Sequence, residues 1–179
     1  MFKIKATSSG IDKIQIIQGE DSTIPYVTRS NMNNGVAMFV STKNNMGLLD
    51  ESGTISIGLD TQTAFYQPSQ YLTGQNIHVV SGEHLTEGVA HFVVTLLRIQ
   101  LRSNFNWGGN GATLGRMKHL KLILPVDDEK NPDWDFMERY TQNVMATKYR
   151  QYLDYIESTE RARDREIRIE GIATSDGVL

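Results

Sequence analysis

Several kinds of residue and segment are missing from this sequence, and each absence excludes a class of protein. With no cysteine among its 179 residues, the chain has neither disulfide bonds nor thiolate metal sites, which fits a reducing cytoplasm. No run of about 18 apolar residues occurs, so we expect no membrane span. The first residues, Met1–Lys5, do not read as a signal peptide. We therefore expect a cytoplasmic protein that does not act at a membrane.

Catalytic and cofactor-binding motifs are missing as well. No Gly-x-Ser-x-Gly motif occurs, and the histidines lack the spacing of a metal site or a catalytic triad; they are His78, His84, His91 and His119. The glycine- and asparagine-rich loop at 103–111 is not followed by the Gly-Lys-Ser/Thr of a P-loop. It is either a plain connection or a close approach to a polyanion with Trp107 as an apolar anchor. We expect no enzyme and no cofactor.

Acidic residues are missing between Glu87 and Asp127, although the whole chain has a net charge of −3. The basic residues of this interval are Arg98, Arg102, Arg116, Lys118 and Lys121. Two interpretations remain open. The clustering is either chance on an ordinary surface or a local cationic patch that faces phosphate groups, which a whole-chain charge would hide.

The chain changes character at residues 122–140. Leu122, Leu124 and Val126 alternate with Ile123, a period of two that predicts a strand. A helix is predicted next, from Pro132 to about Ile169, with nearly all residues charged over Glu157–Glu170 and a frayed tail at Gly171–Leu179. Its start is signalled by Asn131 as N-cap, by Pro132 at the first helical position, and by Asp133 and Asp135 at the positive end of the helix dipole.

Most of the chain before this point reads as strands and loops. Apolar residues in short or alternating runs predict strands at 2–5, 14–17, 24–27, 36–40, 55–59 and 77–80. His78 alternates with apolar neighbours, so we expect it to face solvent or a ligand. From Val89 the apolar spacing becomes helical, with Thr86 as a cap. The elements predict an α+β fold, a β-rich globular part followed by one long C-terminal helix.

Two polar loops stand out among the predicted strands, at 28–35 and 60–63. The first ends in Asn-Gly, a strong turn signal, so turn chemistry alone is one explanation for its composition. The other explanation is base recognition, because arginine matches the edge of guanine and asparagine that of adenine.

The long helix carries two apolar lines. Met137, Tyr140 and Val144 form the first, which we expect to pack on the chain's own globular part. The second has the 4-3-4 spacing of a coiled-coil seam and consists of Met145, Tyr149, Tyr152 and Ile156.

Three blocks resemble the target recognition domain of restriction-modification specificity subunits, especially those of type I and type IIB/IIG systems. They are Ile24–Gly35 (IPYVTRSNMNNG), Ile55–Asn76 (ISIGLDTQTAFYQPSQYLTGQN) and Leu120–Tyr140 (LKLILPVDDEKNPDWDFMERY). They occur in the order of that family, within most of residues 1–145. The resemblance implies a non-catalytic domain that reads one half of a split double-stranded DNA site for a partner adenine methyltransferase or endonuclease.

The resemblance also implies a domain division and an assembly. Residues 1–126 would be the DNA target recognition domain, and residues 127–179 the long helix and tail. Specificity subunits of this family usually have two such domains and two helices, so the chain resembles a half-subunit or a fragment. A homodimer joined through Met145, Tyr149, Tyr152 and Ile156 would restore the two-domain arrangement.

The expected DNA-contacting residues fall into two groups. Base contacts are expected from the two polar loops, at Arg29, Asn31, Asn33, Thr61, Gln62 and Thr63. Backbone contacts are expected from the acid-free interval, at Arg98, Arg102, Arg116 and Lys118. An alternative remains open, a carbohydrate- or protein-binding β domain that oligomerises through its helix.

Overall fold

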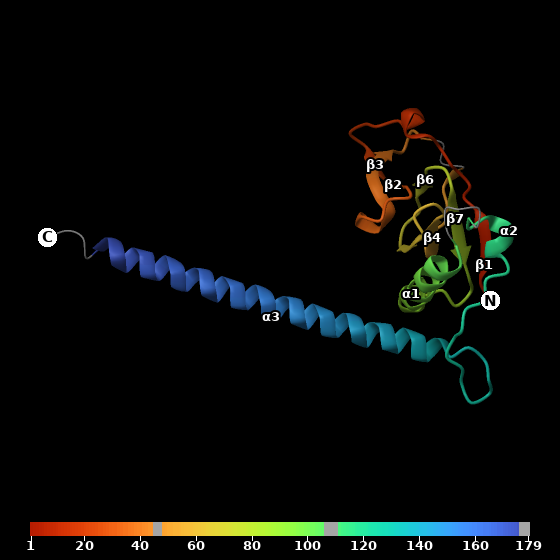
Figure 1. Ribbon diagram of the computed structural model, residues 1–179. Coiled ribbons are helices and arrows are strands. Elements are labelled where there is room, and N and C mark those ends of the chain that lie inside the picture. Colours follow the sequence, from red (N-terminus) through yellow and green to blue (C-terminus); the bar gives the residue numbers. More distant parts are fainter. Residues whose placement is uncertain (45–47, 106–110, 176–179) are drawn as a thin grey trace. The chain divides into compact units, whose positions relative to one another are not determined.

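The structure is a computed structural model (Figure 1) and describes residues 1–44, 48–105 and 111–175, with side chains described as far as residue 163. The chain divides into two compact units, Met1–Thr141 and Gln142–Leu179. Helix α3, Trp134–Ser175, begins in the first unit and continues in the second. The division falls after the predicted boundary at 126–127 because the first turns of α3 pack on the globular unit.

A four-stranded antiparallel sheet forms the centre of the first unit. Its strand order is β1-β7-β4-β5, with bounds Lys3–Ala6, Ile77–Ser81, Thr54–Gly58 and Thr63–Gln67. Helix α1, Glu87–Asn104, covers one face, and the Thr86 side chain accepts a hydrogen bond from the Val89 N–H, as a cap should. The strands predicted at 2–5, 55–59 and 77–80 and the cap at Thr86 are thus confirmed.

A second sheet covers the other face of the first. It has the order β3-β2-β6, with bounds Val36–Ser41, Ser22–Val27 and Leu72–Thr73, and β2 is antiparallel to β3 but parallel to β6. Val79 of β7 packs with Val27 and Tyr71 on this side, whereas Val80 belongs to the core under α1. Strands β4 and β7 are therefore buried on both faces.

The predicted strand at 14–17 is wrong. A short 3₁₀ turn, η1, occupies Lys13–Gln15, and the Asp12 carboxylate accepts from the Ile14 N–H at 3.3 Å. Ile14 is 91% exposed and Ile17 46% exposed, and of the three isoleucines in this run Ile16 is the one that packs against the core of the second sheet.

The expectation that His78 faces solvent or a ligand is also wrong. His78 is buried on β7, paired with Ala6 of β1 and Ile57 of β4. Its Nδ1 lies 3.2 Å from the Ile77 carbonyl, and its Nε2 has no hydrogen-bond partner among the described residues. In a strand covered on both faces, alternation of polar and apolar residues marks no solvent face.

The transition into the long helix differs from prediction at two points. The segment 122–126 is not a strand: Val126 makes a single bridge with Pro132, and Ile123 is 88% exposed. The helix begins at Trp134, and its N-cap is Asp133, whose Oδ1 accepts from the Phe136 N–H at 2.8 Å, so Asn131 and Pro132 do not hold the predicted cap positions. No helix among the described residues is both long and apolar enough to cross a membrane.

The first turns of α3 are fastened to α1. Met137 is fully buried in the core under α1, and Glu138 places its carboxylate at the N-terminus of that helix. Its Oε2 accepts from the Val89 N–H at 3.1 Å and from the Thr86 hydroxyl. Gly88 leaves room for this carboxylate, because a Cβ at position 88 would lie 2.5 Å from it. An anion at this position satisfies otherwise unpaired amides and the positive end of the dipole.

Replacing Glu138 with Ala should lower the free energy of unfolding by about 1–2 kcal/mol, because α1 loses this anionic cap. Urea denaturation followed by circular dichroism measures the change. The matched control is Glu157→Ala, whose exposed carboxylate pairs with Arg161 at 3.1 Å and should contribute no more than about 0.5 kcal/mol. Equal losses in the two variants would contradict a capping role for Glu138.

The stability of the fold should fall as the pH drops below about 6.5, because burial lowers the pKa of His78 from its ordinary value, against a smaller opposing effect of the Ile77 carbonyl. The folded chain then binds fewer protons than the unfolded chain in this range, so acid favours unfolding. Unfolding curves at about pH 7.5 and about pH 5.5 should differ less for His78→Gln than for the wild type. The exposed His119→Gln serves as control and should leave the pH dependence unchanged.

Candidate nucleic-acid interface

The two polar loops predicted from the sequence lie together. The loop 28–35 joins β2 to β3, and the tip 59–62 joins β4 to β5. The Arg29 guanidinium pairs with the Asp60 carboxylate, and the Asn76 side chain donates to the same Asp60 oxygen at 3.2 Å. Gly58 permits the approach, since a Cβ there would lie 3.3 Å from the Arg29 Cα. We call the combined surface of residues 28–35 and 59–63 the loop surface.

The first loop is held by its backbone. Asn33 and Asn34 have φ values of 50° and 54°, the left-handed region that asparagine tolerates better than most residues. The Gln67 side chain donates to the Asn34 carbonyl at 3.0 Å, and the Thr28 N–H donates to the Gly35 carbonyl at 2.8 Å. These bonds use no side-chain atom of Asn31 or Asn33, and both residues are exposed.

The second loop is anchored by its side chains. Gln62, with φ of 56°, donates from its side-chain amide to the Phe105 carbonyl at the end of α1. Thr63 is buried, and its hydroxyl lies 3.0 Å from that of Thr61. Of the three predicted residues of this tip, Thr61 is the one that is exposed.

Arg98 is bound to the strand that follows this tip. Its Nε donates to the Ala64 carbonyl at 2.9 Å, and its guanidinium carbon lies 4.5 Å from the centre of the Phe65 ring. Burial, and then the charge of Arg102, lower the pKa of Arg98 from its ordinary value. Arg102, one turn further along α1, is exposed.

The remaining cations of the acid-free interval lie elsewhere. Helix α2, Leu114–Met117, contains Arg116, which donates to the Gly111 carbonyl at 3.0 Å. Lys118 lines a groove with residues of β1. Because β1 and β5 are opposite edge strands of one sheet, about 14 Å of sheet separates the strand beside Lys118 from the strand beside Arg98. The five basic residues therefore do not form one cluster. Trp107, the apolar anchor in one of the two interpretations of the loop 103–111, lies outside the described residues.

The predicted seam of α3 belongs to the second unit. Tyr149 and Tyr152 are 62% and 61% exposed, while Met145 and Ile156 are partly covered. The neighbouring Leu153 and Tyr155 are also exposed, at 58% and 66%, so the apolar surface is wider than the predicted line.

Two features of the loop surface were missed from the sequence. One is the pairing of Asp60 with Arg29 and Asn76, and the other is the use of the Phe105 carbonyl by Gln62. The sequence shows a polar tip at 60–63, but no local pattern indicates which distant group each residue contacts. Among the described residues, no group of three or more histidine, aspartate or glutamate side chains could hold a metal ion.

Comparisons with known proteins identify the family. Residues 2–154 match the type I restriction modification DNA specificity domain. Among solved structures, the S subunit of the type I restriction-modification system from M. genitalium aligns with 91% of this chain and 41% of that chain, at 15% identity and a TM-score of 0.46. No curated protein matches the sequence significantly. The family match covers most of the chain, and the protein therefore belongs to the type I restriction-modification DNA specificity domain family, as the three sequence blocks predict.

Proposed function

We propose that this chain reads one half of a bipartite double-stranded DNA site, without catalysis, for a partner adenine methyltransferase or endonuclease. Its family is one of DNA specificity domains. The observation that carries the proposal is the loop surface, where polar loops from two different sheets come together at the Arg29–Asp60 pair. Amide, hydroxyl and guanidinium groups suit base edges, which present a code of donors and acceptors.

Within the loop surface, the residues divide by exposure. Asn31, Asn33 and Thr61 are exposed, so they are the first candidates for base contacts. Arg29 is 44% exposed and held in place by Asp60, which presents a fixed guanidinium to an incoming base or phosphate. Gln62 and Thr63 fix the shape of the tip, Gln62 through its bond to Phe105.

The basic residues would contact the DNA backbone. Arg102 is exposed and lies one turn from Arg98, whose contacts with Ala64 and Phe65 place it directly after the tip 59–62. Arg98 and Arg102 are therefore the basic residues that lie next to β5, the strand that follows the tip 59–62. Arg116 and Lys118 are exposed near the opposite edge strand, where they would contact a more distant part of the duplex.

The second unit would provide the surface through which two copies of the chain assemble. A helix that exposes Tyr149 and Tyr152 on one seam is expected to bury them against another chain. One chain supplies one reading domain, so a two-fold homodimer through Met145, Tyr149, Tyr152 and Ile156 would provide two reading domains for a split site. The seam is only about two heptads long, so contacts with the methyltransferase subunit would add to it.

Asn31→Ala should reduce sequence discrimination by about 1–3 kcal/mol, because a base would lose its hydrogen-bond partner while the backbone contacts remain. The DNA site is first identified by sequencing methylated positions after co-purification with the methyltransferase subunit. The ratio of affinities for this site and for random DNA is then measured by fluorescence anisotropy.

Arg102→Ala is the matched control for that experiment. It should weaken both affinities equally and reduce the slope of log affinity against log salt concentration by about one unit. An unchanged ratio in Asn31→Ala would remove the loop surface from base recognition. If the affinity of the wild type for DNA does not change with salt concentration, phosphate contacts are absent and the carbohydrate-binding alternative is favoured.

Tyr149→Glu/Ile156→Glu should convert a dimer into a monomer, because two charges would be placed in the apolar seam. Sedimentation velocity at tens of micromolar measures the change. Arg150→Glu is the control, since it alters an exposed charge on the same stretch of helix outside the seam and should leave a dimer. A monomeric wild type would rule out the homodimer, and a dimer that survives the double variant would place the interface elsewhere.

A further inference from the structure

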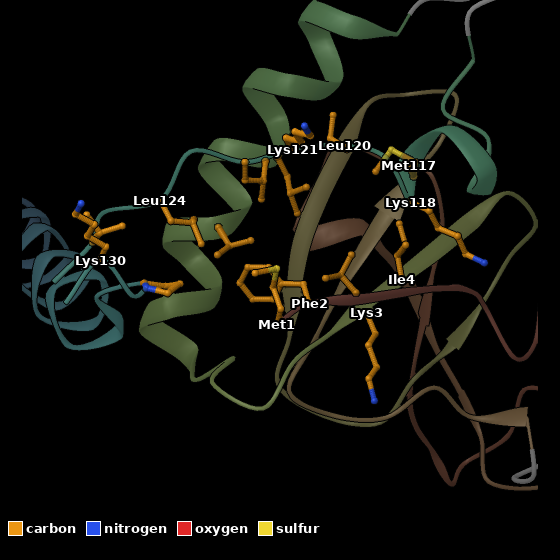
Figure 2. Close-up of a pocket in the computed structure, with 16 residues that line it drawn as sticks. Met1, Phe2, Lys3, Ile4, Met117, Lys118, Leu120, Lys121, Leu124 and Lys130 are labelled. Atoms are coloured by element: carbon orange, nitrogen blue, oxygen red, sulfur yellow. The ribbon is translucent and has the colours of Figure 1, made fainter.

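A groove lies between the beginning of β1 and the segment 117–124 (Figure 2). Its volume of about 580 Å³ falls within the range of roughly 300–1,000 Å³ that is common for ligand sites. Apolar side chains of β7 and α1, Val80, Val93 and Leu97, contribute to its wall. The lining also includes Lys3, Lys118, Lys121 and Lys130 and no acidic residue.

One side of the groove is an open strand edge. Among the described strands, β1 is an edge strand paired only with β7, and the Thr7 N–H donates to the Ile77 carbonyl at 3.1 Å. Since alternate residues of an antiparallel strand bond to the neighbour, Lys3 and Lys5 bond to β7, and Ile4 directs its N–H and C=O to the open edge. Among the described residues, Ile4 has no backbone bond to the segment 117–124.

The opposite side is a segment with strand-like burial and no partner. Leu122 and Leu124 pack against the core while Lys121 and Ile123 are exposed. Within the described part of the chain, the backbone N–H groups of residues 121–124 donate to no backbone carbonyl. Backbone groups of this kind are usually paired, so the groove is bordered on both sides by chain that can accept a further strand.

We propose that this groove receives an extended segment of a partner protein, in which apolar and acidic residues alternate, and that the segment adds a strand to β1. Side chains on one face of such a strand would enter the apolar part of the groove, and those on the other would meet the lysines. A segment of about four residues, roughly 13 Å long, matches the four residues of β1.

The charges distinguish this partner from two other occupants. Lysines on an edge strand repel a second copy of the same strand, so Lys3 and Lys5 disfavour self-pairing through β1. DNA phosphates would satisfy the lysines but leave the apolar part of the groove in water. A polypeptide segment with acidic and apolar residues can do all three: its carboxylates pair with the lysines, its apolar side chains cover the apolar lining, and its backbone bonds to the open edge of β1.

The test uses the full chain and two synthetic peptides, acetylated and amidated hexapeptides of alternating valine and glutamate or of alternating valine and lysine. The glutamate peptide should bind at least about tenfold more tightly, because like charges across an interface are repelled. Hydrogen exchange of the Ile4 amide should slow on binding, since strand addition pairs that N–H. Lys3→Glu/Lys121→Glu should invert the preference, whereas the control Lys13→Glu/Lys43→Glu, altered outside the groove, should keep it.

Three results would overturn the proposal. The first is absence of binding by either peptide at millimolar concentration. The second is binding of the glutamate peptide with no change in exchange at Ile4, which would mean charge attraction without strand addition. The third is weakened DNA binding by Lys3→Glu/Lys121→Glu together with no peptide binding, which would assign the groove to the DNA surface. None of these results depends on whether the loop surface reads bases.

Discussion

The covering of β4 and β7 on both faces is the constraint on which the rest of the structure depends. Helix α1 packs on one face and the second sheet on the other, so the β2–β3 loop and the β4–β5 tip leave the two sheets at one place. Gly58 sets how closely they approach, because any side chain there would meet the Arg29 backbone and the hydroxyls of Thr61 and Thr63. A recognition surface built in this way is held by packed sheets rather than by the loops alone.

Elements that depend on local spacing could be predicted from the sequence. The strands around Ile55 and Ile77 and helix α1 with its Thr86 cap follow from periodicity and capping, and the long helix follows from its periodicity, although its cap lies two residues after the predicted one. The failures have a shared cause in tertiary context. The runs at 14–17 and 122–126 have strand composition, but a strand needs a partner, and a sequence pattern does not reveal whether one is present.

The candidate site was predictable as a set of polar loops but not as an arrangement. Arg29 and Asp60 are 31 positions apart, and Gln62 and Phe105 are 43 apart, so no local rule could show that they contact each other. The same limit applies to the acid-free interval. Its cations are neighbours in sequence, yet α1 carries Arg98 to β5 while α2 and the following segment bring Lys118 beside β1.

The two places differ in a way that decides what each can contact. Beside β5, Arg98 is held by the Ala64 carbonyl and the Phe65 ring directly after the polar tip, and Arg102, one turn further along α1, is exposed. A cation presented in this way next to a polar loop suits phosphate contacts. Beside β1, Lys3 and Lys121 adjoin apolar side chains and, within the described part of the chain, backbone N–H groups of residues 121–124 that donate to no backbone carbonyl. Leaving that surface in contact with water or phosphate would forgo the free energy of burying it. In the two proposals, positive charge alone therefore does not define a nucleic-acid surface; the groups next to each cation decide whether phosphate or the carboxylates of a protein are the better partner.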